Sequence, residues 1–129
     1  MVRNFLNYIK ILRVGHWPKQ IFLIPGFIYA ILISNYSEIN YSNQTIFLNI
    51  AICFLITNFA SSANYCINEY LDSQYDKHHP LKKNRPSVKN EINPIILILQ
   101  YILLSGSTLI AAFLINYYFF FTIMMFLIS

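Results

Sequence analysis

Residues 45–67 read TIFLNIAICFLITNFASSANYCI, a stretch without a charged side chain. A helix needs roughly 20 apolar residues to cross the hydrocarbon core of a bilayer, which is about 30 Å thick. This stretch has that length, so we predict that it spans a membrane. Cys53 and Cys66 would then lie about 20 Å apart along the helix axis, too far for a disulfide or a shared zinc ion.

Three other apolar segments can play the same role, at residues 17–34, 94–115 and 117–129. A single helix from Pro94 to Ser129 would be about 54 Å long, well beyond a bilayer, so we divide it near Asn116. The last segment is too short for a full span. The expected fold is an all-α transmembrane bundle with about four spans, in which the fourth is truncated and the chain is the N-terminal part of a longer protein.

The composition supports a membrane protein. The chain has 129 residues, of which 57% are hydrophobic and only 11% are charged, whereas an ordinary soluble domain carries about 25% charged residues. These values exclude a disordered segment, a coiled coil and a nucleic-acid-binding arm, so we expect the lipid bilayer and no nucleic acid as a partner. The excess of 9 Lys and Arg over 5 Asp and Glu suits a phosphate-rich ligand.

All positive charges fall in two segments. Four precede the apolar heart of the first span, at residues 21–34, and five lie between the second and third spans: Arg3, Lys10, Arg13, Lys19, Lys77, Lys82, Lys83, Arg85 and Lys89. Positive loops resist translocation. We therefore expect a multi-pass protein of the cytoplasmic membrane, with its N-terminus and the 68–92 loop in the cytoplasm. In residues 3–13, apolar side chains recur with polar ones between them, which is typical of a short amphipathic helix at the membrane interface.

A row of oxygen-bearing side chains follows the second span. Asn68, Asp72 and Asp76 recur every four residues, so on a helix they share one face. Mg²⁺ binds one or two carboxylates, keeps several waters and completes its shell with substrate phosphate oxygens. The row therefore indicates a magnesium and diphosphate site, with Asp72 and Asp76 as the catalytic carboxylates.

A simpler interpretation is a solvated helix end whose acids pair with Lys77 and Arg85. Two features favour a site instead. Asn64 and Asn68 lie at or inside the apolar boundary, where polar groups usually serve a function. The acids are also followed directly by cations, which are the other half of a phosphate site.

We expect the helix to end at His79, because Pro80 follows it and the residue before a proline leaves the α region. The basic segment begins there. Lys82 and Arg85 follow on an irregular segment, and Arg offers a planar fork for phosphate. We expect both to bind the diphosphate and His79 to hydrogen-bond near it. Arg13 and Lys19 lie on the same expected side of the membrane and are further candidates.

These residues resemble the first Asp-rich motif of the UbiA superfamily of membrane prenyltransferases. The family pattern N-x-x-x-D-x-x-x-D is met by Asn68, Asp72 and Asp76. Its continuation H-P-x-K-x-x-R-P is met by His79, Pro80, Lys82, Arg85 and Pro86. The extended motif is most similar to the branch that contains decaprenyl-phosphate phosphoribosyltransferases, as is the pattern R-x-x-x-W-x-K of Arg13, Trp17 and Lys19.

The resemblance implies an all-helical bundle with a polar site that opens to the cytoplasm and a portal for an isoprenoid. Asp72 and Asp76, assisted by Asn68, would hold Mg²⁺ on a diphosphate, and Lys82 and Arg85 would bind its oxygens. The diphosphate would belong to a prenyl diphosphate, or to phosphoribosyl pyrophosphate with a polyprenyl phosphate as acceptor. The family's second Asp-rich motif lies in a later half, so we expect these residues to be inactive alone.

Two other functions remain open. A small accessory protein could anchor in the membrane with a basic loop, and its acids at four-residue spacing would then be incidental. A transporter fragment could line a polar path with Asn64 and Asn68, but such a path would need ionisable groups near the middle of several spans, and the other three have none there. We place the transferase first, the accessory protein second and the transporter last.

Overall fold

Every regular element in the described part of the chain is a helix. The computed structural model describes residues 2–36, 42–76, 88 and 92–128. The elements, in chain order, are α1 (Val2–Ile11), the 3₁₀-helix η1 (Val14–Leu23), α2 (Ile24–Tyr36), α3 (Asn43–Asp76), α4 (Pro94–Ile115) and α5 (Tyr117–Ile128). The expected all-α class is confirmed for these residues.

Within the described residues, two helices are long and apolar enough to cross a membrane, with spans at Gln44–Ser73 in α3 and Pro94–Ile115 in α4. The other two expected spans appear as shorter apolar helices, at Gln20–Ile33 and Tyr117–Ile128. The 34 residues of α3 contain neither glycine nor proline, so nothing in its sequence interrupts the helix. At 1.5 Å per residue α3 is about 51 Å long, more than a hydrocarbon core, so part of it must project from the bilayer.

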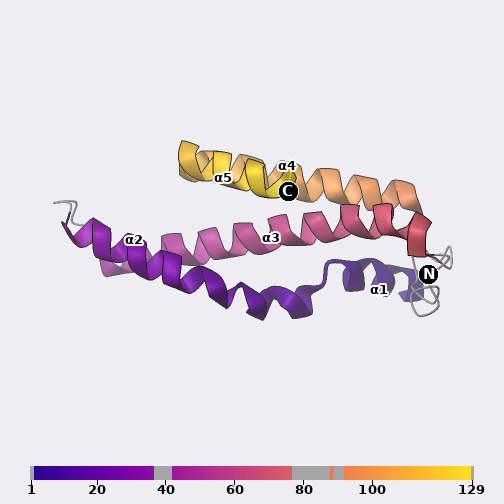
Figure 1. The fold of residues 1–129 in the computed structure, drawn as a ribbon, viewed down its shortest axis with the longest axis horizontal. Coiled ribbons are helices and arrows are strands. Elements are labelled where there is room, and N and C mark those ends of the chain that lie inside the picture. Colours follow the sequence, from indigo (N-terminus) through magenta and orange to yellow (C-terminus); the bar gives the residue numbers. More distant parts are fainter. Residues whose placement is uncertain (1, 37–41, 77–87, 89–91, 129) are drawn as a thin grey trace.

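The helices form a layered bundle with α3 at its centre. Figure 1 shows α1, η1 and α2 along one side of α3, and α4 and α5 along the other. α4 runs antiparallel to α3, and α5 folds back beside α4. The N-terminus, the Asp76 end of α3 and the Pro94 end of α4 therefore lie at one end of the bundle, which we call the polar end (Figure 1).

The break between α4 and α5 has a local cause. Asn116 adopts an extended conformation, with φ −164° and ψ 141°. Its side-chain oxygen accepts a hydrogen bond from the Tyr118 amide at 2.8 Å and so caps the start of α5. At the other end of α4, the Asn93 side chain accepts from the Ile95 amide at 2.9 Å, with Pro94 in the first turn.

Two apolar clusters hold the bundle together. At the polar end, Ile11, Cys66, Ile92 and Leu97 join α1, α3 and the start of α4. A second cluster of Ile56, Ala60, Ala112 and Ile123 joins α3, α4 and α5. Ala60 and Ala112 are fully buried, and small residues of this kind let membrane helices approach closely.

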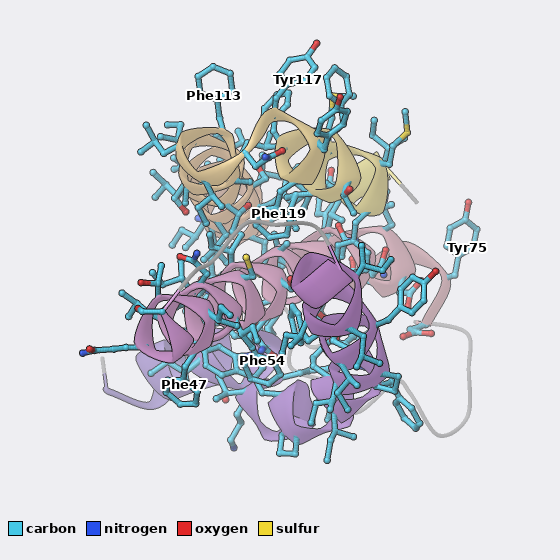
Figure 2. All side chains as sticks on the ribbon, turned by 90° about the vertical axis from the view of Figure 1, so that its left-hand side faces the viewer. Phe47, Phe54, Tyr75, Phe113, Tyr117 and Phe119 are labelled. Atoms are coloured by element: carbon cyan, nitrogen blue, oxygen red, sulfur yellow. The ribbon has the colours of Figure 1, made fainter. Side chains whose placement is uncertain are left out.

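The outward face of α4 and α5 is strongly apolar. Phe113 and Tyr117 point away from the bundle (Figure 2). Leu114 is 79% exposed and Tyr118 is 81% exposed. Such a face would be costly in water but not against lipid, and it agrees with the membrane spans of α3 and α4.

Candidate functional site

The acidic row lies on the helix itself. α3 continues unbroken to Asp76, past residue 67, where we expected the membrane span itself to end. Asn68, Asp72 and Asp76 therefore fall within an arc of about 80° on its last three turns. Asn68 and Asp72 are exposed, whereas Asp76 is 5% exposed. The row thus offers an open carboxylate at Asp72 and a covered one at Asp76.

The turn that follows α1 is fastened to the middle of α3 by Ser62. The Ser62 hydroxyl donates a hydrogen bond to the Leu12 carbonyl oxygen at 2.9 Å and accepts one from the Trp17 indole Nε1 at 3.2 Å. Trp17 also packs edge-on against Phe59, with ring centroids 5.4 Å apart. One buried hydroxyl therefore holds both ends of the segment 12–17.

Arg13 lies between these two attachment points. Its backbone is left-handed, with φ 47° and ψ 42°, and it is the one non-glycine residue with positive φ in the described part of the chain. Such a conformation costs an L-residue roughly 1–2 kcal/mol. The surrounding contacts maintain it, which is typical of functional sites.

The Arg13 guanidinium reaches α3 at two residues. Nη2 lies 4.0 Å from Oε2 of Glu69, and Cζ lies 4.8 Å from the centroid of the Tyr65 ring. Tyr65 also meets His16 edge-on, with centroids 5.8 Å apart. Since Glu69 precedes Asp72 by three residues, this cation stands beside the acidic row. We call Arg13, Tyr65, Glu69 and Asp72 the arginine–acid cluster.

Two members of this cluster, Tyr65 and Glu69, were not among the residues predicted from the sequence, and Glu69 is the charged one. The helical position of Glu69 could have indicated it. At 3.6 residues per turn, one side of α3 carries Ser62, Tyr65, Glu69 and Asp76. A carboxylate so close to an apolar span also calls for a cation nearby.

The other expected binding residues are only partly described. Lys19 belongs to η1, but the position of its side chain is not among the described features. His79, Lys82 and Arg85 lie outside the described residues. Of the six expected diphosphate-binding residues, Asn68 and Arg13 are thus the two whose side chains are described.

Asn64 forms a hydrogen bond to a helix far along the chain. Its amide nitrogen donates to the Phe126 carbonyl oxygen of α5 at 2.8 Å. Asn64, one turn before Asn68 on the same helix, therefore also joins α3 to α5.

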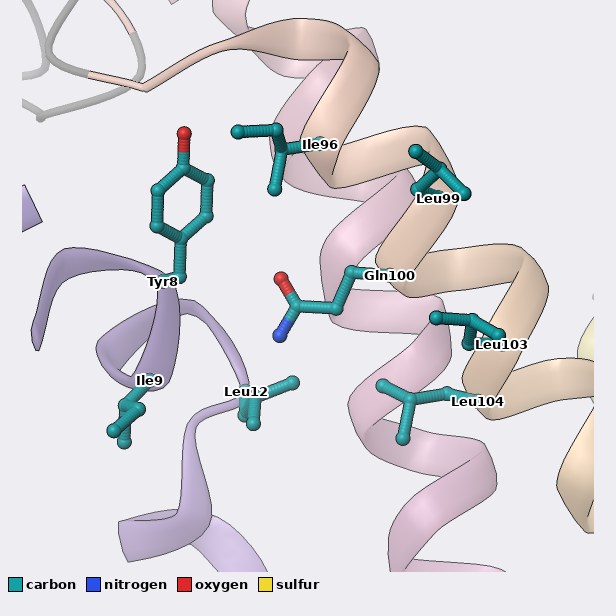
Figure 3. A pocket seen from close by; sticks show the side chains of 8 residues that line it. All are labelled: Tyr8, Ile9, Leu12, Ile96, Leu99, Gln100, Leu103 and Leu104. Atoms are coloured by element: carbon teal, nitrogen blue, oxygen red, sulfur yellow. The ribbon is translucent and has the colours of Figure 1, made fainter. Parts of the chain in front are cut away.

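An apolar cavity of about 490 Å³ opens between α1 and α4, close to the same end of the bundle. Figure 3 shows Gln100 pointing from α4 into the space near Tyr8 and Leu12. The remaining lining residues are apolar: Ile9, Ile96, Leu99, Leu103 and Leu104. Leu12 lines this cavity and directly precedes Arg13, so a hydrocarbon-lined space adjoins the segment that carries the cation.

The model of the UbiA prenyltransferase family matches residues 22–129. This chain belongs to that family. It is similar to the decaprenyl-phosphate phosphoribosyltransferase of Corynebacterium glutamicum, at 33% identity over 78 residues, which are 60% of this chain and 22% of that protein. The enzyme of the same name from Mycobacterium tuberculosis is 26% identical over 78 residues, 60% of this chain and 24% of the relative. The matched stretch is thus about a quarter of each relative's length, and no solved structure matches the chain.

The donor atoms of this UbiA chain suit Mg²⁺ as a partial site. No group of three or more His, Cys, Asp or Glu side chains comes together among the described residues. Asp72 with Asn68 one turn before it offers hard oxygen ligands, and Mg²⁺ needs only one or two carboxylates when phosphate oxygens and waters complete its shell. The residues fit a metal that arrives with a diphosphate.

Proposed function

We propose that this UbiA-family chain forms one half of the site of a Mg²⁺-dependent membrane transferase that acts on a diphosphate substrate. Phosphoribosyl transfer from phosphoribosyl pyrophosphate to a polyprenyl phosphate is the reaction that we favour. The observation that carries the proposal is the arginine–acid cluster, in which a half-exposed guanidinium pairs with Glu69, three residues before the exposed Asp72. The names of the two relatives favour phosphoribosyl over prenyl transfer.

In this proposal Asp72, Asp76 and Asn68 hold the metal. When bound, Mg²⁺ neutralises charge that develops on the departing diphosphate. Arg13 binds phosphate oxygens through its planar N–H groups. Lys19, His79, Lys82 and Arg85 are proposed to add further donors around the same group, as their match to the family motif implies.

The lipid substrate calls for an apolar surface next to the charged site. The cavity lined by Leu12 and Leu103 adjoins Arg13 along the chain, and we propose it as a place for part of the polyprenyl chain. We also propose that the polar end faces the cytoplasm, because the cationic N-terminal segment and the Asp76 end of α3 lie there together.

Binding measurements on the chain in phosphatidylcholine nanodiscs test this function. We expect phosphoribosyl pyrophosphate to bind with Mg²⁺ and to be released by EDTA, and Asp72→Asn to lose that binding. Tyr75→Phe is the control, because Tyr75 is exposed on the same helix and outside the cluster. Tighter binding of a prenyl diphosphate would assign prenyl transfer instead. Metal-independent binding that ignores Asp72→Asn would favour the accessory protein.

A further inference from the structure

We propose that Glu69 is a positioning residue, which holds the Arg13 guanidinium where a phosphate group can reach it. This inference rests on the proposed function, because it assigns to Arg13 a phosphate ligand. It assigns a role to a residue at a position that the family motif quoted above leaves unspecified.

The burial of the two charges is unequal. The Glu69 side chain is 10% exposed, whereas that of Arg13 is 38% exposed. A covered carboxylate within an apolar span is costly unless a cation lies nearby. Glu69 therefore attracts Arg13 toward α3, while the outer part of the guanidinium stays accessible.

The geometry leaves the donors of Arg13 available. The 4.0 Å separation from Glu69 is longer than a hydrogen bond. The other contact is with the ring of Tyr65, which supports a cation without accepting a conventional hydrogen bond. Within the described residues, the guanidinium is thus held by charge and stacking, and its five N–H groups remain for an anion.

The backbone limits where this side chain can go. Ser62 fixes the chain on both sides of Arg13, through Leu12 and Trp17. The left-handed conformation of Arg13 then directs its side chain toward Tyr65 and Glu69. Asp72 is three residues beyond Glu69 on the same helix, so the same contact places the cation next to the proposed metal ligand.

The proposal can be tested by whether neutralising Glu69 raises or lowers the affinity for a phosphate ligand. A carboxylate beside an anion-binding site repels the anion, so neutralising Glu69 should strengthen binding if the residue does nothing else. If Glu69 positions Arg13, its loss should weaken binding because the guanidinium is released from α3. The two roles predict opposite changes in affinity.

The experiment measures the affinity of the chain in nanodiscs for inorganic pyrophosphate with Mg²⁺, by ³¹P NMR titration. We expect Glu69→Gln to weaken binding roughly tenfold, and Glu69→Asp, which keeps the charge but shortens the reach, to weaken it less. In an Arg13→Gln background, Glu69→Gln should cause no further loss, because there is no guanidinium left to position. Glu38→Gln is the matched control, since it removes a carboxylate from the segment before α3.

The outcomes distinguish the positioning role of Glu69 from the proposed function. Unchanged or tighter binding in Glu69→Gln would overturn the positioning role and leave the proposed function standing. If circular dichroism shows that Glu69→Gln has lost its helices, Glu69→Asp decides, and wild-type affinity in that variant would overturn the role. An unsubstituted chain that shows no Mg²⁺-dependent binding would instead overturn the proposed function, and the positioning role with it.

Discussion

The indole nitrogen of Trp17 donates to the hydroxyl of Ser62, 45 positions along the chain, at 3.2 Å. This bond joins the N-terminal segment to the middle of the long helix α3. The same hydroxyl donates to the Leu12 carbonyl oxygen. Hydrogen bonds to Ser62 therefore hold the chain on both sides of Arg13. The orientation of the proposed phosphate ligand therefore depends on a serine buried in the membrane span.

Ser62→Ala should loosen this turn. It removes two hydrogen bonds, and the loss of a buried bond costs about 1–3 kcal/mol. Trp17 is the only tryptophan in the chain, so its fluorescence reports the change directly. We expect a shifted emission maximum and a lower unfolding temperature in detergent. Ser61→Ala is the control, and equal spectra for the two variants would contradict the fastening role.

Arg13→Lys should weaken pyrophosphate binding although the charge is kept. Lysine is a point charge without the planar fork, and it stacks less well on Tyr65. We expect roughly a tenfold loss of affinity, measured by ³¹P NMR titration with Mg²⁺. Lys10→Arg, on the exposed side of α1, should leave the affinity unchanged. Equal affinity of Arg13→Lys and the unsubstituted chain would show that any positive charge suffices.

Ala112→Leu should separate α4 from α3. Ala112 is fully buried against Ile56, Ala60 and Ile123, and overpacking such a site typically costs 1–3 kcal/mol. The expected result is a lower unfolding temperature in detergent. Leu114→Ala, at an exposed position of the same helix, should change it little. A stable Ala112→Leu chain would mean that this close approach does not hold the two spans together.

Cysteine labelling tests the proposed sidedness. In a variant that lacks Cys53 and Cys66, single cysteines at Gln44 and Tyr75 lie near opposite ends of α3 and are both exposed. A membrane-impermeant maleimide added to intact cells should label Gln44→Cys only, and Tyr75→Cys should react after the cells are opened. Labelling of both positions in intact cells would contradict the topology.

The sequence predicted the parts of the fold that depend on local pattern. The apolar run at 45–67 and the segment 94–115 appear as the spans of α3 and α4. The four-residue spacing of Asn68, Asp72 and Asp76 placed them on one helical face, and α3 does extend through all three. These predictions succeed because helix length and periodicity are properties of adjacent residues.

The missing parts depend on distant contacts. The pairing of Arg13 with Glu69 joins two segments far apart in sequence, and no local signal indicates which acid an arginine will meet. The left-handed backbone of Arg13 and the 3₁₀ geometry of η1 belong to a segment that is hydrogen-bonded to Ser62 of α3, a contact far away in sequence. The hydrogen bond from Asn64 to the Phe126 carbonyl oxygen was missed for the same reason, since Phe126 lies on α5.

The most direct test of the central claim is the Mg²⁺-dependent binding of phosphoribosyl pyrophosphate to the Asp72→Asn chain in nanodiscs, measured beside the unsubstituted chain and Tyr75→Phe. We expect Asp72→Asn to insert and fold normally but to lose the binding that EDTA abolishes in the other two. Undiminished Mg²⁺-dependent binding in Asp72→Asn would contradict the central claim, because the exposed carboxylate of α3 would then have no part in holding the metal.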